Sequence, residues 1–221
     1  GEIPPPQVLV HKNLKLWSFY VDLEESLGTI DSTKNAYNKM FDLKIVTPQI
    51  VINYASFMEE NKFFEEAFKV YEKGVAIFKY PHVKEIWSTY LKKFVGRFQG
   101  SKLERARDLF EQAIAAAPPE EAKPIYLMYA KYEEDYGLAR HAMAVYDKAT
   151  KAVQESDKLQ IYELYIQRAS EFFGVTKTRE IYEEAIEAGL GYKDVRTMCM
   201  KYASLERKLG EIDRARAIYI H

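Results

Sequence analysis

The chain has 221 residues, of which 48% are apolar and 29% are charged, and its 32 Lys and Arg nearly balance 33 Asp and Glu. The apolar content suffices for a folded core, and the formal net charge of −1 argues against a dedicated nucleic-acid clamp, which needs a strongly basic face. The single cysteine excludes an internal disulfide and a cysteine-clustered zinc site and favours a reducing compartment, and no apolar run approaches the length that crosses a membrane.

From its first residue, the chain is expected to form a leader, residues 1–10, and then one repeat array over residues 11–221. An aromatic residue recurs six times at intervals of 34 to 39 residues, and a second aromatic series follows in step. The first series is Tyr20, Tyr54, Tyr90, Tyr129, Tyr165 and Tyr202, and the second is Tyr37, Tyr71, Phe110, Tyr146, Tyr182 and Tyr219. Together they predict repeats at approximately 14–45, 47–79, 82–117, 121–155, 157–189 and 193–221, the last one truncated.

Each repeat is expected to consist of two helices. In the third repeat, Ala106, Phe110 and Ala113 have the spacing of one helical face. Glycines are expected to end the first helix of four repeats, and prolines to separate one repeat from the next. These residues are Gly28, Gly137, Gly174 and Gly210, and Pro48, Pro81, Pro118, Pro119 and Pro124. The sequence therefore predicts an all-α fold, an α–α superhelix (solenoid) of about six tetratricopeptide-like helical hairpins. Residues 211–219 have the pattern of a helix without a stop signal, so we expect a fragment of a longer protein.

Charged and small residues recur at fixed positions around the aromatic ones. A glutamate stands four residues after the first aromatic in three copies, and in several copies a small residue and a basic residue precede the second aromatic, as in Ala106-Arg107. The glutamates are Glu24, Glu133 and Glu206. This pattern resembles the HAT (half-a-TPR) repeat. Three positions depart from it, because Phe68 and Met143 stand where the repeat has Arg and Ala169 stands where it has Glu.

Longer segments, turns included, carry a more specific resemblance. HKNLKLWSFYVDLEESLGT from His11 and KLERARDLFEQA from Lys102 are similar to the SYF-type pre-mRNA-splicing factors, also called XPA-binding proteins, which are HAT-repeat proteins. The similarity covers nearly the whole chain. It implies that the chain comes from the C-terminal part of such an array.

The resemblance implies a non-catalytic protein–protein interaction scaffold of the spliceosome, in the NineTeen-associated or intron-binding complex, that acts in pre-mRNA splicing. It also implies a nuclear location and other spliceosomal proteins as partners, including a crooked-neck-type HAT protein and NineTeen-complex members. The resemblance further implies a role in transcription-coupled DNA repair, with the repair factor XPA as a partner. RNA contact is expected to be indirect, and no membrane partner is expected. Two alternatives stay open: a generic tetratricopeptide-like adaptor, and a helical-repeat RNA-binding protein with steeply salt-dependent binding.

No residue is expected to be catalytic, to bind a cofactor or to bind a metal, and the partner-binding residues are unknown from the sequence alone. His82 and Glu85 are expected to be exposed at a helix start, since a di-iron bundle needs paired Glu-x-x-His motifs. The Gly-Leu-Gly of residues 189–191 is expected to be a turn. Cys199 stands at an anchor position and is expected to be buried, and His141 is given no ligand role.

The recurring aromatic residues raise the question of RNA stacking. Because they fall at inter-helix packing positions, we interpret them as core residues rather than as base-stacking platforms. The Arg of the Ala-Arg pair is expected to bind a nearby acid such as Asp108 or Glu111 as readily as a phosphate.

Overall fold

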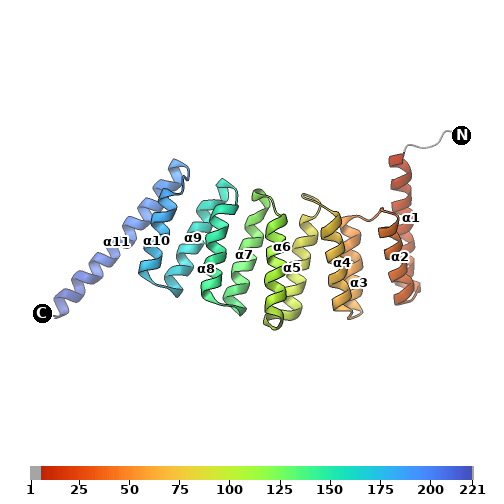
Figure 1. Ribbon diagram of the computed structural model, residues 1–221, viewed down its shortest axis with the longest axis horizontal. Helices are drawn as coiled ribbons and strands as arrows, with labels where there is room; N and C mark the ends of the chain where they lie inside the picture. Colours follow the sequence, from red (N-terminus) through yellow and green to blue (C-terminus); the bar gives the residue numbers. More distant parts are fainter. Residues whose placement is uncertain (1–5, 221) are drawn as a thin grey trace. The chain divides into compact units, whose positions relative to one another are not determined.

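The computed structural model describes residues 6–220, and residues 1–5 and 221 lie outside the description. Every regular element in that range is a helix, which confirms the predicted all-α helical-repeat solenoid (Figure 1). The chain divides into two compact units, residues 1–97 and 98–221. The helices of the first unit are α1 (Pro6–Leu27), α2 (Ile30–Asp42), α3 (Pro48–Glu60), α4 (Phe64–Ile77) and α5 (Lys84–Phe98). Those of the second are the 3-10 turn η1 (Gln99–Lys102) and α6 (Leu103–Ala116), α7 (Pro119–Tyr136), α8 (Ala139–Ala152), α9 (Glu155–Phe172), α10 (Val175–Glu187) and α11 (Tyr192–Ile220).

In the first unit, α1 to α4 pack in chain order, each on the helix before it, and α5 packs on α4 through aromatic rings. Thr29 begins α2 with a reciprocal pair of hydrogen bonds, because its hydroxyl accepts from the N–H of Ser32 and the Ser32 hydroxyl accepts from the N–H of Thr29. Thr47 caps α3 through its hydroxyl. Helices α3 and α4 approach closely at Gly74, where a Cβ would lie 2.6 Å from Val51 Cγ1.

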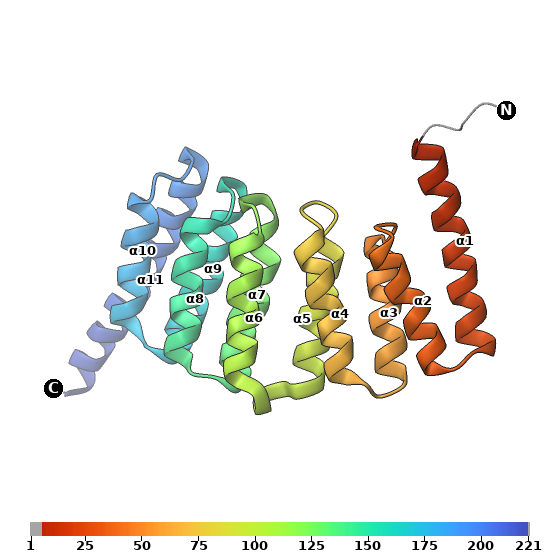
Figure 2. The same cartoon turned by 45° about the vertical axis from the view of Figure 1, so that its right-hand side comes forward.

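In the second unit, α6 to α11 also pack in chain order. Figure 2 shows that α6, α8 and α10 form one layer and that α7, α9 and α11 form the other. Gly174 turns the chain between α9 and α10 with a φ of +79°, a left-handed conformation that favours glycine. At Gly137, between α7 and α8, a Cβ would collide with a carboxylate oxygen of Glu133. The turns therefore place the second helices of successive repeats side by side in one layer.

The prediction that Gly210 ends a helix is wrong, because α11 continues through it without a break. Glycine weakens a helix interior by only about 1 kcal/mol, which does not by itself end a helix. The expectation that Pro124 separates repeats is also wrong, since Pro124 lies inside α7. There Ile125 and Tyr126 are buried, and their packing outweighs the lost backbone hydrogen bond.

Two predicted boundaries fall differently along the chain. Helix α1 begins at Pro6, within the residues expected to be a leader. The third predicted repeat, 82–117, is divided between the units, with α5 in the first and α6 in the second.

The expectation that Cys199 is buried is wrong, because its side chain is exposed. The neighbouring Met198 is fully buried instead. Because α11 runs straight past Gly210, no second helix of the same repeat folds over it within the described residues. The side of α11 that carries Cys199 is therefore left in solvent.

Candidate functional site

A pair of parallel aromatic rings joins each second helix to the first helix that follows it. The centroid distance and interplanar angle are 4.6 Å and 4° for Tyr37–Tyr54, 5.2 Å and 13° for Tyr71–Tyr90, 4.8 Å and 2° for Phe110–Tyr129, 5.9 Å and 14° for Tyr146–Tyr165, and 5.1 Å and 2° for Tyr182–Tyr202. The two aromatic series are therefore the two halves of one repeated contact. All but Tyr202 of these rings are buried, which confirms for them the interpretation as core residues. Tyr20 is 41% exposed, and the side chain of Tyr219 lies outside the described residues.

An ion pair between an arginine and a glutamate accompanies the stacked rings at the α6–α7 and α10–α11 interfaces. At α6–α7, Arg107 donates from Nε to Glu133 Oε1 at 2.6 Å and from Nη2 to Oε2 at 3.0 Å. At α10–α11, Arg179 binds Glu206 through the same atoms at 2.6 and 3.1 Å. We call this two-point contact the Arg–Glu clamp. It differs between the two interfaces in burial, since the Glu133 side chain is 1% exposed and that of Glu206 is 42% exposed.

The clamp corrects the expected partner of the arginine. Arg107 does not pair with Asp108 or Glu111 but crosses to Glu133 in the next repeat, with Glu104 as a second partner at 2.8 Å. The contacts of Glu133 raise the pKa of the Arg107 guanidinium, which stays charged. Glu111 binds Lys148 at 3.0 Å and accepts a hydrogen bond from the hydroxyl of Tyr129 at 3.1 Å.

The residues that depart from the repeat pattern replace the clamp in matched pairs. Phe68 stands at the arginine position of α4 and contacts Phe94, at the glutamate position of α5, with centroids 5.3 Å apart. Met143 in α8 and Ala169 in α9 occupy the same two positions at the α8–α9 interface, and both are buried. At both interfaces the arginine position and the glutamate position are apolar together, so no buried charge is left without its partner.

The second helices enclose grooves whose floors are formed by the first helices between them. In the first unit, a groove of about 550 Å³ lies between α2 and α4 over Tyr54. In the second unit, a groove of about 280 Å³ lies between α6 and α8 over Tyr129, and one of about 600 Å³ lies between α8 and α10 over Tyr165. We take these three concave strips as candidate functional sites, because hollows at equivalent places in several repeats suit a binding surface.

Ion pairs occupy two of the three grooves. In the α2–α4 groove, Lys34 binds Glu66 at 3.0 Å and bridges the two walls. The α6–α8 groove contains the Arg107–Glu133 clamp, to which His141 of α8 adds a contact of 2.8 Å between its Nδ1 and Arg107 Nη2. Within the described residues, no ion pair joins α8 to α10, since the ion pairs there stay within one helix. In this part of the chain, no ion pair therefore connects the two walls of the α8–α10 groove. The floor of this groove belongs to α9, and at the α8–α9 interface Met143 and Ala169 stand in place of the clamp.

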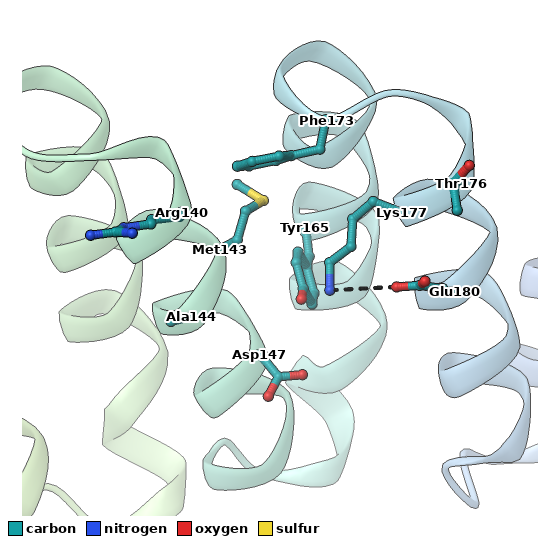
Figure 3. Close-up of a pocket in the computed structure, with 9 residues that line it drawn as sticks. All are labelled: Arg140, Met143, Ala144, Asp147, Tyr165, Phe173, Thr176, Lys177 and Glu180. Atoms are coloured by element: carbon teal, nitrogen blue, oxygen red, sulfur yellow. Dashed lines mark ion pairs between the residues drawn. The ribbon is translucent and has the colours of Figure 1, made fainter.

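The α8–α10 groove has distinct ends (Figure 3). At the end near the α9–α10 turn, the half-exposed ring of Phe173 lies beside the Met143 side chain, and Arg140 stands at the rim. The other end carries carboxylates, with Asp147 on α8 and Glu180 on α10 in the lining, and Glu184 of α10 within hydrogen-bonding reach of Asp147. Burial and the charge of Asp147 raise the pKa of the Glu184 carboxyl. The groove therefore has an apolar contact and Arg140 near one end and carboxylates near the other, with Lys177 between them beside Tyr165.

The remaining sequence candidates carry no site. His82 and Glu85 are exposed, with His82 in the turn before α5 and Glu85 in its first turn, as expected. Gly189 adopts a φ of +80° in the α10–α11 connection, which confirms the turn. No group of three metal-ligating side chains lies together in the part of the chain that the structure describes. In residues 6–220 we find no helix long and apolar enough to cross a membrane.

The sequence matches, over residues 1–221, the family described as the pre-mRNA-splicing factor Syf1/CRNKL1 C-terminal HAT repeat. It is 59% identical over 220 residues to pre-mRNA-splicing factor SYF1 of Dictyostelium discoideum, covering 100% of this chain and 26% of that protein. It is 59% identical over 215 residues to SYF1 of Homo sapiens, covering 97% and 25%. It is 51% identical over 216 residues to pre-mRNA-splicing factor cwf3 of Schizosaccharomyces pombe, covering 98% and 27%. The chain thus spans about a quarter of the length of these relatives.

Proposed function

The chain belongs to the family of the C-terminal HAT repeat of Syf1/CRNKL1-type pre-mRNA-splicing factors, and from this membership we propose that it is a non-catalytic protein-binding scaffold in pre-mRNA splicing. In this role, the chain holds other splicing proteins through side chains on its second helices. The relatives are described as splicing factors, and they are about four times as long as this chain.

The observation that carries the proposal is the presence of grooves between second helices in both units. Grooves of about 550 Å³ in the first unit and of about 280 and 600 Å³ in the second have charged rims and aromatic floors. A solenoid with recurrent hollows suits several weak contacts to one extended partner, and avidity then supplies the affinity.

The proposal extends to the complex and the compartment. The partners are other spliceosomal proteins of the NineTeen-associated or intron-binding complex, including a crooked-neck-type HAT protein, and the site of action is the nucleus. A second role in transcription-coupled DNA repair through XPA belongs to the same proposal. The support for these points is the resemblance to SYF-type factors over nearly the whole chain.

An RNA-binding solenoid is the competing function. Two observations speak against it: the net charge of −1, and the burial of the stacked rings, which leaves them little surface on which a base could stack. A generic adaptor outside RNA processing would use the same grooves, so the identity of the partners separates it from the proposal.

The test is a pull-down of the tagged chain from nuclear extract, with and without nuclease, followed by mass spectrometry. The control is the tag alone. Recovery of splicing proteins that resists nuclease is expected. Loss of that recovery on nuclease treatment would favour the RNA-binding alternative, and recovery of other proteins would favour the generic adaptor.

A further inference from the structure

Among the grooves of the solenoid, the one between α8 and α10 is closed by no ion pair between its walls, and its exposed groups complement a ligand. Arg140 is exposed at the rim, and among the described residues its guanidinium forms no ion pair or hydrogen bond. Phe173 is 45% exposed, and other large apolar side chains on the two adjacent turns are also exposed. These are Tyr136, Leu138, Phe172 and Val175. An unpaired cation beside an apolar surface is a feature of binding sites rather than of plain solvated helices.

The opposite end of the groove needs positive charge. Asp147 and Glu184 face each other from α8 and α10, and Glu180 lies near them on the α10 wall. Lys151 binds Asp147 at 3.3 Å and Lys177 lies 3.8 Å from Glu180. Two lysines are therefore paired with the three carboxylates of Asp147, Glu180 and Glu184, which leaves one negative charge in excess. A further cation at this end would relieve the repulsion between the carboxylates.

The length of the groove suits a short extended segment. Arg140 and Asp147 are seven residues apart on α8, which corresponds to about 10 Å along the helix axis. An extended chain covers that distance in about three residues.

We propose that the α8–α10 groove binds an extended segment of a partner polypeptide in which a carboxylate, a large apolar side chain and a basic side chain occupy alternate positions. The carboxylate binds Arg140, the apolar side chain packs on Met143 and Phe173, and the basic side chain reaches Asp147 and Glu184. Alternate side chains of an extended segment point to the same face, so five residues, or four steps of about 3.3 Å, span the length of the groove and the reach of Arg140. This inference rests on the proposed protein-binding function and names the chemistry of one ligand.

The experiment measures binding of three fluorescein-labelled peptides to the 221-residue chain by fluorescence anisotropy. The first peptide has the core Glu-Ser-Leu-Ser-Lys, the second has Gln in place of both charged residues, and the third has Lys in place of the Glu. The wild-type chain should bind the first peptide about fivefold more tightly than the other two, since exposed charge pairs contribute up to about 1 kcal/mol each.

Charge reversal at the rim provides the decisive variant. Arg140→Glu should reverse the preference toward the third peptide by a similar factor, whereas Phe173→Ala should weaken all three peptides alike. Arg196→Glu, at an exposed position on α11, is the matched control and should leave binding unchanged. Arg140 lies in the first turn of α8, where an acidic residue is favourable, so Arg140→Glu should keep the wild-type melting temperature.

Equal binding of the three peptides, or the same preference in Arg140→Glu as in the wild type, would overturn the assignment. Binding of none of them at about 1 mM would also overturn it. In the nuclear-extract experiment, recovery of the same splicing proteins by wild type and Arg140→Glu would leave the scaffold function standing and reject this groove. Recovery of no splicing protein by either would reject the scaffold function itself.

Discussion

Replacement of Arg107 by Met should destabilise the second unit by about 3–5 kcal/mol, because the carboxylate of Glu133 would stay buried without its main partner. Glu133 is 1% exposed, and Arg107 supplies its two short hydrogen bonds, at 2.6 and 3.0 Å. What remains for the carboxylate is the N–H of Leu138 at 3.4 Å and the ring of His141 at 3.7 Å. Neither contact replaces the charge of the guanidinium.

The double variant Arg107→Met with Glu133→Ala should recover most of this loss. It reproduces the residues that the chain itself uses at the α8–α9 interface, Met143 and Ala169, which are both buried. When a buried ion pair is exchanged for well-packed apolar residues, the net change in stability is often near zero, whereas removal of one partner is costly. The loss of stability in Arg107→Met should therefore arise from the buried, unpaired carboxylate of Glu133 and not from the absence of an attractive contact.

Urea unfolding followed by circular dichroism measures the free energies, and amide hydrogen exchange in α6 and α7 locates the change. The matched control is Arg179→Met, since Arg179 and Glu206 have the same geometry but are 43% and 42% exposed. This variant should lose far less stability because water solvates the remaining carboxylate. Equal losses in the two single variants, or no recovery in the double variant, would refute the reasoning.

Three further results are expected. Burial and the charge of Glu66 raise the pKa of the Tyr54 hydroxyl to about 12. The stabilisation that the neutral hydroxyl gives the folded state should therefore be complete below about pH 10 and be lost as the pH rises toward 12. Urea unfolding at increasing pH checks this. Gly137→Ala should lower the melting temperature because its Cβ would collide with Glu133, whereas Gly96→Ala, in a helix with no atom near the new Cβ, should raise stability by about 1 kcal/mol. Trp87→Ala should cost about 3–5 kcal/mol, and an unchanged melting temperature would contradict its place in the core.

The register of the repeats could be predicted from the sequence because the stacked rings sit at a near-constant spacing. The partner across each interface could not be predicted in the same way, because Arg107 has nearer acids in its own helix. A signal was nevertheless present. The offset of 26 residues from Arg107 to Glu133 also leads from Phe68 to Phe94 and from Met143 to Ala169, so at each of these interfaces both positions change together.

The wrong predictions share one physical cause. Gly210 and Pro124 are local helix breakers, but packing decides where a helix ends, and each of them lies inside a helix. Cys199 has the spacing of an anchor, but its burial would require a second helix folded over α11. The α8–α10 groove could not be found from the sequence because it depends on side chains from three helices and on a missing ion pair.

The most direct test of the scaffold function is chemical cross-linking of splicing complexes that contain the full-length protein, read out by mass spectrometry. Lys151 and Lys177 lie on the two helices that form the α8–α10 groove and serve as reporters. We predict cross-links from these lysines to a different splicing protein, through a segment that carries acidic, apolar and basic residues. Cross-links confined to this protein itself, together with ultraviolet cross-links of α8 and α10 to RNA, would contradict the account.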